Sequence, residues 1–153
     1  MGPADIVVVD GGGEITLVEC KLAANPQVRR EIIGQLFDYA ARLWRMDIGV
    51  FSQKWVDRTG VRPFPPDDVG ELLRTEVSNN LREGAFRLVL AVDEINEPLK
   101  RMVEYLNARS TTGVSVVAVS YSRYQYGDVQ VLMGSVPRSG GVSRHRAGQL
   151  VIV

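Results

Sequence analysis

Two short runs of β-branched residues open the chain, "DIVVVD" at 5–10 and "EITLVECKL" at 14–22, on either side of three glycines. Glycine tolerates the positive φ that hairpin loops require, so the pattern predicts a pair of antiparallel strands. In a hairpin symmetric about Gly12, paired residues have numbers that sum to 24. This register places Asp5 opposite Glu19.

A helical pattern follows from about Pro26 to Trp44, where proline suits the first turn of a helix. Apolar residues recur there every three or four positions, which predicts a stripe that faces the sheet. The stripe consists of Val28, Ile32, Leu36, Tyr39 and Leu43.

The next stretch, 47–68, has no clear period and contains three prolines, so it is predicted to be a long loop. The overlapping segment 67–84 ends in Gly84 and has the pattern of an amphipathic helix. Its predicted buried face comprises Val69, Leu72, Leu73, Val77 and Leu81.

The second half of the chain predicts a strand at 86–92, a helix at 96–110 and a strand at 114–122, which is the pattern of a βαβ crossover. A closing strand is predicted at 127–136. The expected fold class is therefore α/β, a sandwich in which helices flank a mixed central sheet.

The 153 residues are 45% hydrophobic, which favours one globular domain, placed at 1–137, with a flexible Ser/Gly/Arg-rich tail at 138–153. Eighteen basic and eighteen acidic residues cancel, so any electropositive surface must be local. The single cysteine, Cys20, excludes an internal disulfide. With no signal-peptide pattern and no apolar run near the roughly 20 residues of a membrane span, a cytoplasmic protein is expected, without a membrane partner.

The charges on the hairpin suggest a site. Side chains alternate along a strand, so Lys21 shares a face with Glu19, whereas Cys20 points the other way, into the expected core. Directly opposed carboxylates repel each other, which requires something to compensate for Asp5 opposite Glu19. A hard divalent cation would do so, with the lysine beside the same phosphate.

An alternative interpretation is a solvated edge strand with a weak ion pair between Glu19 and Lys21. Against it, the strand is apolar on both faces near the loop, which is typical of an interior strand. A carboxylate is also available on its partner strand. In addition, Gln35 and Tyr39 lie one helical turn apart and should face the sheet together.

The order of these motifs resembles the PD-(D/E)XK nuclease superfamily. Pro3-x-Asp5 and Glu19-x-Lys21 precede a helix with Gln35-x-x-x-Tyr39, which is similar to the RecB-like branch. The resemblance implies a restriction-endonuclease-like αβββαβ core and metal-dependent hydrolysis of DNA phosphodiester bonds, with Mg2+ or Mn2+ as the cofactor and DNA as the partner.

The same resemblance implies a role for each residue. Asp5 and Glu19 would bind the metal together with the backbone carbonyl of Cys20, and Lys21 would position water or stabilise charge on the phosphate. Gln35 and Tyr39 would orient the site or the nucleic-acid strand.

The chain departs from the family pattern near its start, where Ala4 separates Pro3 from Asp5 and only four residues precede that aspartate. A helix commonly comes before this strand in the family. Three explanations remain open: a longer parent chain, a helix supplied from elsewhere, as in a homodimer, or an incomplete site. The alternative functions are a non-catalytic nucleic-acid-binding or assembly module and a purely structural domain.

Several basic residues could contact nucleic acid. Arg29 and Arg30 lie in the first turns of the predicted helix, where they would either bind the DNA backbone or remain solvated. The stretch 47–68 carries Lys54, Arg58 and Arg62 around Trp55, which predicts either a guide for a nucleic-acid strand or a loop fixed by a buried tryptophan.

Overall fold

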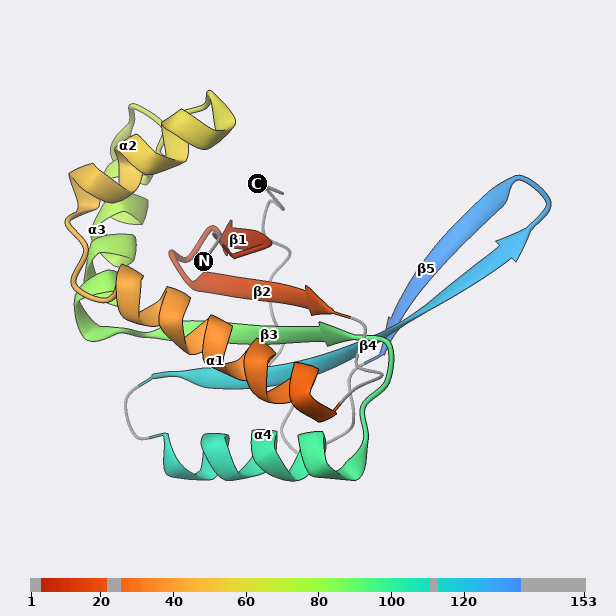
Figure 1. The fold of residues 1–153 in the computed structure, drawn as a ribbon. Coiled ribbons are helices and arrows are strands. Elements are labelled where there is room, and N and C mark those ends of the chain that lie inside the picture. Colours follow the sequence, from red (N-terminus) through yellow and green to blue (C-terminus); the bar gives the residue numbers. More distant parts are fainter. Residues whose placement is uncertain (1–3, 22–25, 111–112, 136–153) are drawn as a thin grey trace.

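The computed structural model describes residues 4–21, 26–110 and 113–135. Five strands and four helices form in these ranges (Figure 1). The strands are β1 (Ile6–Val9), β2 (Ile15–Lys21), β3 (Phe86–Val92), β4 (Ser115–Tyr126) and β5 (Val129–Ser135). The helices are α1 (Pro26–Leu43), α2 (Ile48–Thr59), α3 (Asp68–Glu83) and α4 (Glu97–Arg109). The predicted tail, 138–153, lies outside the described residues.

The strands form one mixed sheet in the order β1-β2-β3-β4-β5. The three central strands are parallel, and the outer strands β1 and β5 are antiparallel to their neighbours. Strands β3 and β4 are joined through α4, so the predicted βαβ crossover and the α/β class are confirmed. Strand β4 continues to Tyr126, beyond the predicted end, and forms with β5 a two-stranded ribbon that projects from the sheet (Figure 1).

The core lies between the sheet and α1, which crosses β2 and β3 (Figure 1). Three members of the predicted helical stripe are buried, Ile32, Leu36 and Tyr39, and they pack in one cluster with Leu17 and Leu88 of the sheet. Of the described helices, none is long and apolar enough to cross a membrane.

The predicted loop at 47–68 is wrong, because its first half is the helix α2. The side chain of Asp47 caps the start by accepting from the backbone N–H groups of Gly49 and Val50, and Gly60 ends the helix in the left-handed conformation. All three prolines follow this end, so they do not interrupt the helix.

Helix α3 forms as predicted and ends at Gly84, but its buried face is narrower than expected. Val77 and Leu81 are fully buried, whereas Val69 and Leu72 are about two-thirds exposed. The five apolar positions cover a wider arc of the helix surface than the side of α3 that packs against the rest of the protein.

Candidate metal and phosphate site

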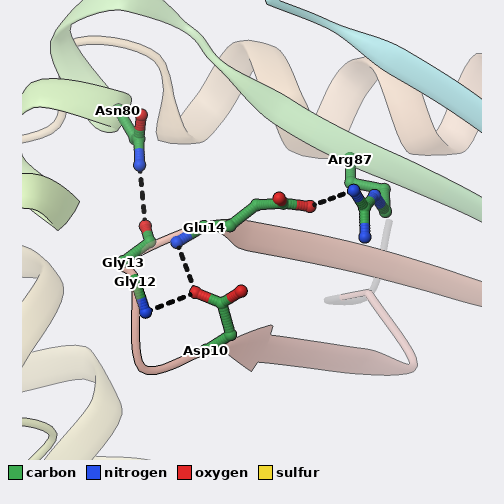
Figure 2. Close-up of polar contacts among 6 residues, drawn as sticks. All are labelled: Asp10, Gly12, Gly13, Glu14, Asn80 and Arg87. Carbon is green, nitrogen blue, oxygen red and sulfur yellow. Dashed lines mark hydrogen bonds and ion pairs between the residues drawn. The ribbon is translucent and has the colours of Figure 1, made fainter. Parts of the chain in front are cut away.

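The hairpin of β1 and β2 has the predicted register, with Ile6 opposite Val18 and Val9 opposite Ile15. The Asp10 side chain sets the turn, because its Oδ1 accepts hydrogen bonds at 2.9 Å from the backbone N–H groups of Gly12 and Glu14 (Figure 2). Such local side-chain bonds select one turn geometry, and the turn determines the strand register.

Two contacts then attach this loop to the rest of the molecule (Figure 2). Asn80 of α3 donates from Nδ2 to the carbonyl of Gly13 at 2.7 Å, and Arg87 of β3 forms an ion pair with Glu14 at 2.8 Å. Gly13 has φ of 81°, and a Cβ there would lie 2.6 Å from the Cβ of Glu76. Only glycine therefore fits this close contact between the hairpin and α3.

The opposite, open end of the hairpin brings the predicted acids and lysine together. Asp5 Oδ2 accepts a hydrogen bond at 2.9 Å from the backbone N–H of Cys20, which places the carboxylate beside the end of β2. Lys21 Nζ lies 3.8 Å from Glu19 Oε1 and donates to Gln35 Oε1 on α1 at 2.6 Å. The helix thus orients the lysine beside the two acids.

Glu19 is the only charged residue that lies in the core of the described structure, with 4% of its surface exposed. Its Oε2 atom is buried without a hydrogen-bond partner among the described residues. Burial raises the pKa of this carboxyl and the nearby charge of Asp5 raises it further, whereas the charge of Lys21 and a hydrogen bond from the Asp5 backbone oppose the rise. A buried carboxylate that is only partly compensated is costly, which makes Glu19 the strongest candidate for a ligand-binding group.

Tyr39 of α1 also lies near Glu19 and Asp5. Its side chain is 7% exposed, and the pKa of its hydroxyl is raised first by burial and then by the charges of Glu19 and Asp5. The predicted pair of Gln35 and Tyr39 therefore does face the strand that carries Glu19, although only Gln35 forms a hydrogen bond with the lysine.

The acidic side chains suit a cation that needs few protein ligands. No cluster of three or more His, Cys, Asp or Glu residues is present in the described part of the chain. Mg2+ is often held by one or two carboxylates, while waters and substrate phosphate complete its shell. The unpartnered oxygen of Glu19 and the adjacent Asp5 carboxylate fit this mode, and the ammonium group of Lys21 is the positive charge beside them.

The prediction for the Cys20 side chain is wrong, because it is exposed and not buried in the core. It points away from Glu19, as alternation requires, but the sheet face on that side is open at this position. The proposed metal-binding role of its backbone carbonyl stays a prediction.

The predicted basic contacts fall into two groups. Arg29 and Arg30 lie within α1, but their side chains lie outside the described residues. Lys54, Trp55 and Arg58 belong to α2 and line a cavity together with Tyr39. This cavity is not apparent from the sequence, because 47–68 looks irregular; the capping pair Asp47 and Gly60 is the signal that reveals the helix.

Comparison with known proteins identifies no relative: no family model, curated protein or solved structure matches the chain.

Proposed function

We propose that the protein hydrolyses DNA phosphodiester bonds with Mg2+ or Mn2+, on a restriction-endonuclease-like fold. One observation carries the proposal: the buried Glu19 oxygen has no partner in the described structure and lies with Asp5 and Lys21 at one end of the hairpin. The order of Asp5, Glu19-x-Lys21 and Gln35-x-x-x-Tyr39, which resembles PD-(D/E)XK nucleases, supports this assignment.

In this proposal Asp5 and Glu19 hold the metal ion, which activates water and polarises the phosphate when bound. Lys21 stabilises the negative charge that develops on the phosphate oxygens. Gln35 keeps the ammonium group in place through the 2.6 Å hydrogen bond, so that little reorganisation is needed during the reaction. The buried Tyr39 helps exclude bulk water from Glu19.

A second candidate is a non-catalytic nucleic-acid-binding or assembly module. It is favoured by the small number of acidic side chains at the site, since no third one joins Asp5 and Glu19 in the described ranges. Two strands, β1 and β2, also precede α1 in the described order, whereas three strands precede the second helix of the αβββαβ core. A binding module would bind DNA in a salt-sensitive way without cleaving it.

Cleavage of labelled single-stranded and double-stranded DNA with Mg2+, Mn2+ or EDTA tests the proposal. Lys21→Ala should lower the cleavage rate by about 100-fold or more, as expected for the loss of one electrostatic contact to the transition state. Lys100→Ala is the matched control, because Lys100 also lies within 4 Å of a glutamate, at 3.9 Å from Glu97, but on the surface of α4.

Metal-dependent cleavage that is lost in Lys21→Ala and retained in Lys100→Ala supports the nuclease. Folded wild-type protein that binds DNA but does not cleave it would favour the binding module. Equal cleavage by wild type and Lys21→Ala would remove Lys21 from the mechanism.

A further inference from the structure

A cavity of about 480 Å3 lies next to the proposed metal site. It is a partly open cavity lined by the hairpin, the C-terminal half of α1 and α2. Tyr39, which contributes to the surroundings of Glu19, lines the cavity, as does Ala4, the residue before Asp5. The cavity is therefore lined by residues that adjoin the two carboxylates.

The inner wall of the cavity is apolar and aromatic. Phe51 and Trp55 come from successive turns of α2, with ring centroids 5.9 Å apart, and both are buried. Val7 and Leu17 of the hairpin line the same cavity. Its volume is within the range of roughly 300–1,000 Å3 that is typical of small-molecule sites.

The rim is predominantly cationic. Arg42, Lys54 and Arg58 line it, against one acid, Asp57. Arg42 pairs with Asp38 at 2.8 Å, whereas Lys54 and Arg58 are exposed and form no ion pair with any described residue. Two available cations at the mouth of an apolar cavity complement a ligand with a flat apolar part and a negatively charged part.

A nucleotide has this combination, and the proposed substrate contains it. A base in a duplex must be unstacked and unpaired before it can enter a cavity, and this energetic cost is smallest for a base that is already single-stranded. Aromatic side chains and a basic groove are the usual means of holding single strands. We propose that this cavity binds an unpaired base of single-stranded DNA, with its phosphates at Lys54 and Arg58 and the neighbouring phosphodiester at Asp5 and Glu19.

This inference rests on the proposed function for the position of the neighbouring phosphodiester, but binding tests it separately from cleavage. Fluorescence anisotropy in EDTA compares labelled (dT)10 with a ten-residue abasic strand of equal charge. Wild type should bind (dT)10 about tenfold more tightly, because only this strand offers bases to the cavity.

Two variants separate the rim from the cavity. Lys54→Gln with Arg58→Gln should weaken binding of both strands about tenfold, whereas the matched double variant Lys100→Gln with Arg101→Gln on α4 should not. Met46→Trp fills the cavity and retains the rim charges, so it should remove the preference for (dT)10 and keep the affinity for the abasic strand. Circular dichroism checks the fold of each variant.

Equal affinity of wild type for the two strands, or full affinity in the folded rim variant, would overturn the inference. Cleavage is measured independently in the presence of metal. Base-dependent binding without cleavage would support the cavity assignment and contradict the nuclease function. Metal-dependent cleavage with unchanged DNA binding in the rim variant would support the nuclease function and contradict the cavity assignment.

Discussion

The two ends of the hairpin formed by β1 and β2 hold acids in different ways. At the loop end, Asp10 accepts two backbone hydrogen bonds and Glu14 pairs with Arg87 at 2.8 Å. Glu14 Oε1 therefore has a cation beside it although it forms no hydrogen bond. At the open end, Glu19 is more deeply buried, and its Oε2 has neither a hydrogen bond nor an ion pair with the described residues. Partnered acids stabilise a fold, whereas a buried acid without a full set of partners weakens it.

In the proposed function, this difference separates a structural role of the loop end from a ligand-binding role of the open end. The loop end determines the register, and the register in turn places Asp5 near Glu19 at the other end. The open end retains the free-energy cost of burying Glu19 Oε2 without a partner. Proteins commonly retain such a cost only where the buried group binds a ligand. The loop end should therefore control stability, and the open end should control ligand binding.

The largest expected effect comes from disrupting the loop end with Gly13→Ala. The added Cβ would meet Glu76 at 2.6 Å, and alanine is disfavoured at a φ of 81°. The free energy of unfolding should fall by about 2–5 kcal/mol, as measured by urea denaturation.

Gly11→Ala is the matched control in the same loop, since nothing lies within 4 Å of a Cβ at Gly11. Its effect should stay within about 0.5 kcal/mol. A similar loss of stability in both variants would contradict the role assigned to the contact between Gly13 and α3.

In the absence of metal, Glu19→Gln should raise the free energy of unfolding, by less than Gly13→Ala lowers it. Because the folded protein raises the pKa of Glu19, its native state favours the protonated form, and wild-type stability should fall as pH increases from about 4.5 through the raised pKa. Above that range, Glu19→Gln should be about 1 kcal/mol more stable than wild type. Urea denaturation in EDTA at several pH values measures this difference.

Glu14→Gln changes the same chemical group at the loop end and should show the smallest effect. Loss of the half-buried ion pair with Arg87 should lower the unfolding free energy by less than about 1 kcal/mol at neutral pH. If both substitutions changed stability in the same direction under these conditions, the contrast between the two ends would be wrong.

Local sequence features predict the hairpin register and the position of α1. Three glycines between β-branched runs specify the pairing, and regularly spaced apolar residues identify the helix face that contains Tyr39. Alternation places Lys21 on the face of Glu19, but the hydrogen bond between Lys21 and Gln35 depends on how α1 packs on the sheet. The site could thus be predicted as a group of residues, without its contacts.

Other features depend on tertiary context. Alternation gives the direction of the Cys20 side chain, but not whether another element covers it. The prolines after Gly60 obscure α2, although Asp47 and Gly60 are good capping residues and Phe51 and Trp55 lie one turn apart. Because α2 supplies one wall of the cavity, missing that helix also hides the cavity.

The most direct test is the metal dependence of the melting temperature in wild type, Glu19→Gln and Glu14→Gln. A ligand that binds only the folded state stabilises it according to its concentration relative to its Kd. Mg2+ or Mn2+ should raise the melting temperature of wild type and Glu14→Gln by similar amounts, and that of Glu19→Gln by much less. No shift in wild type, or an undiminished shift in Glu19→Gln, would contradict the assignment of Glu19 as a metal ligand.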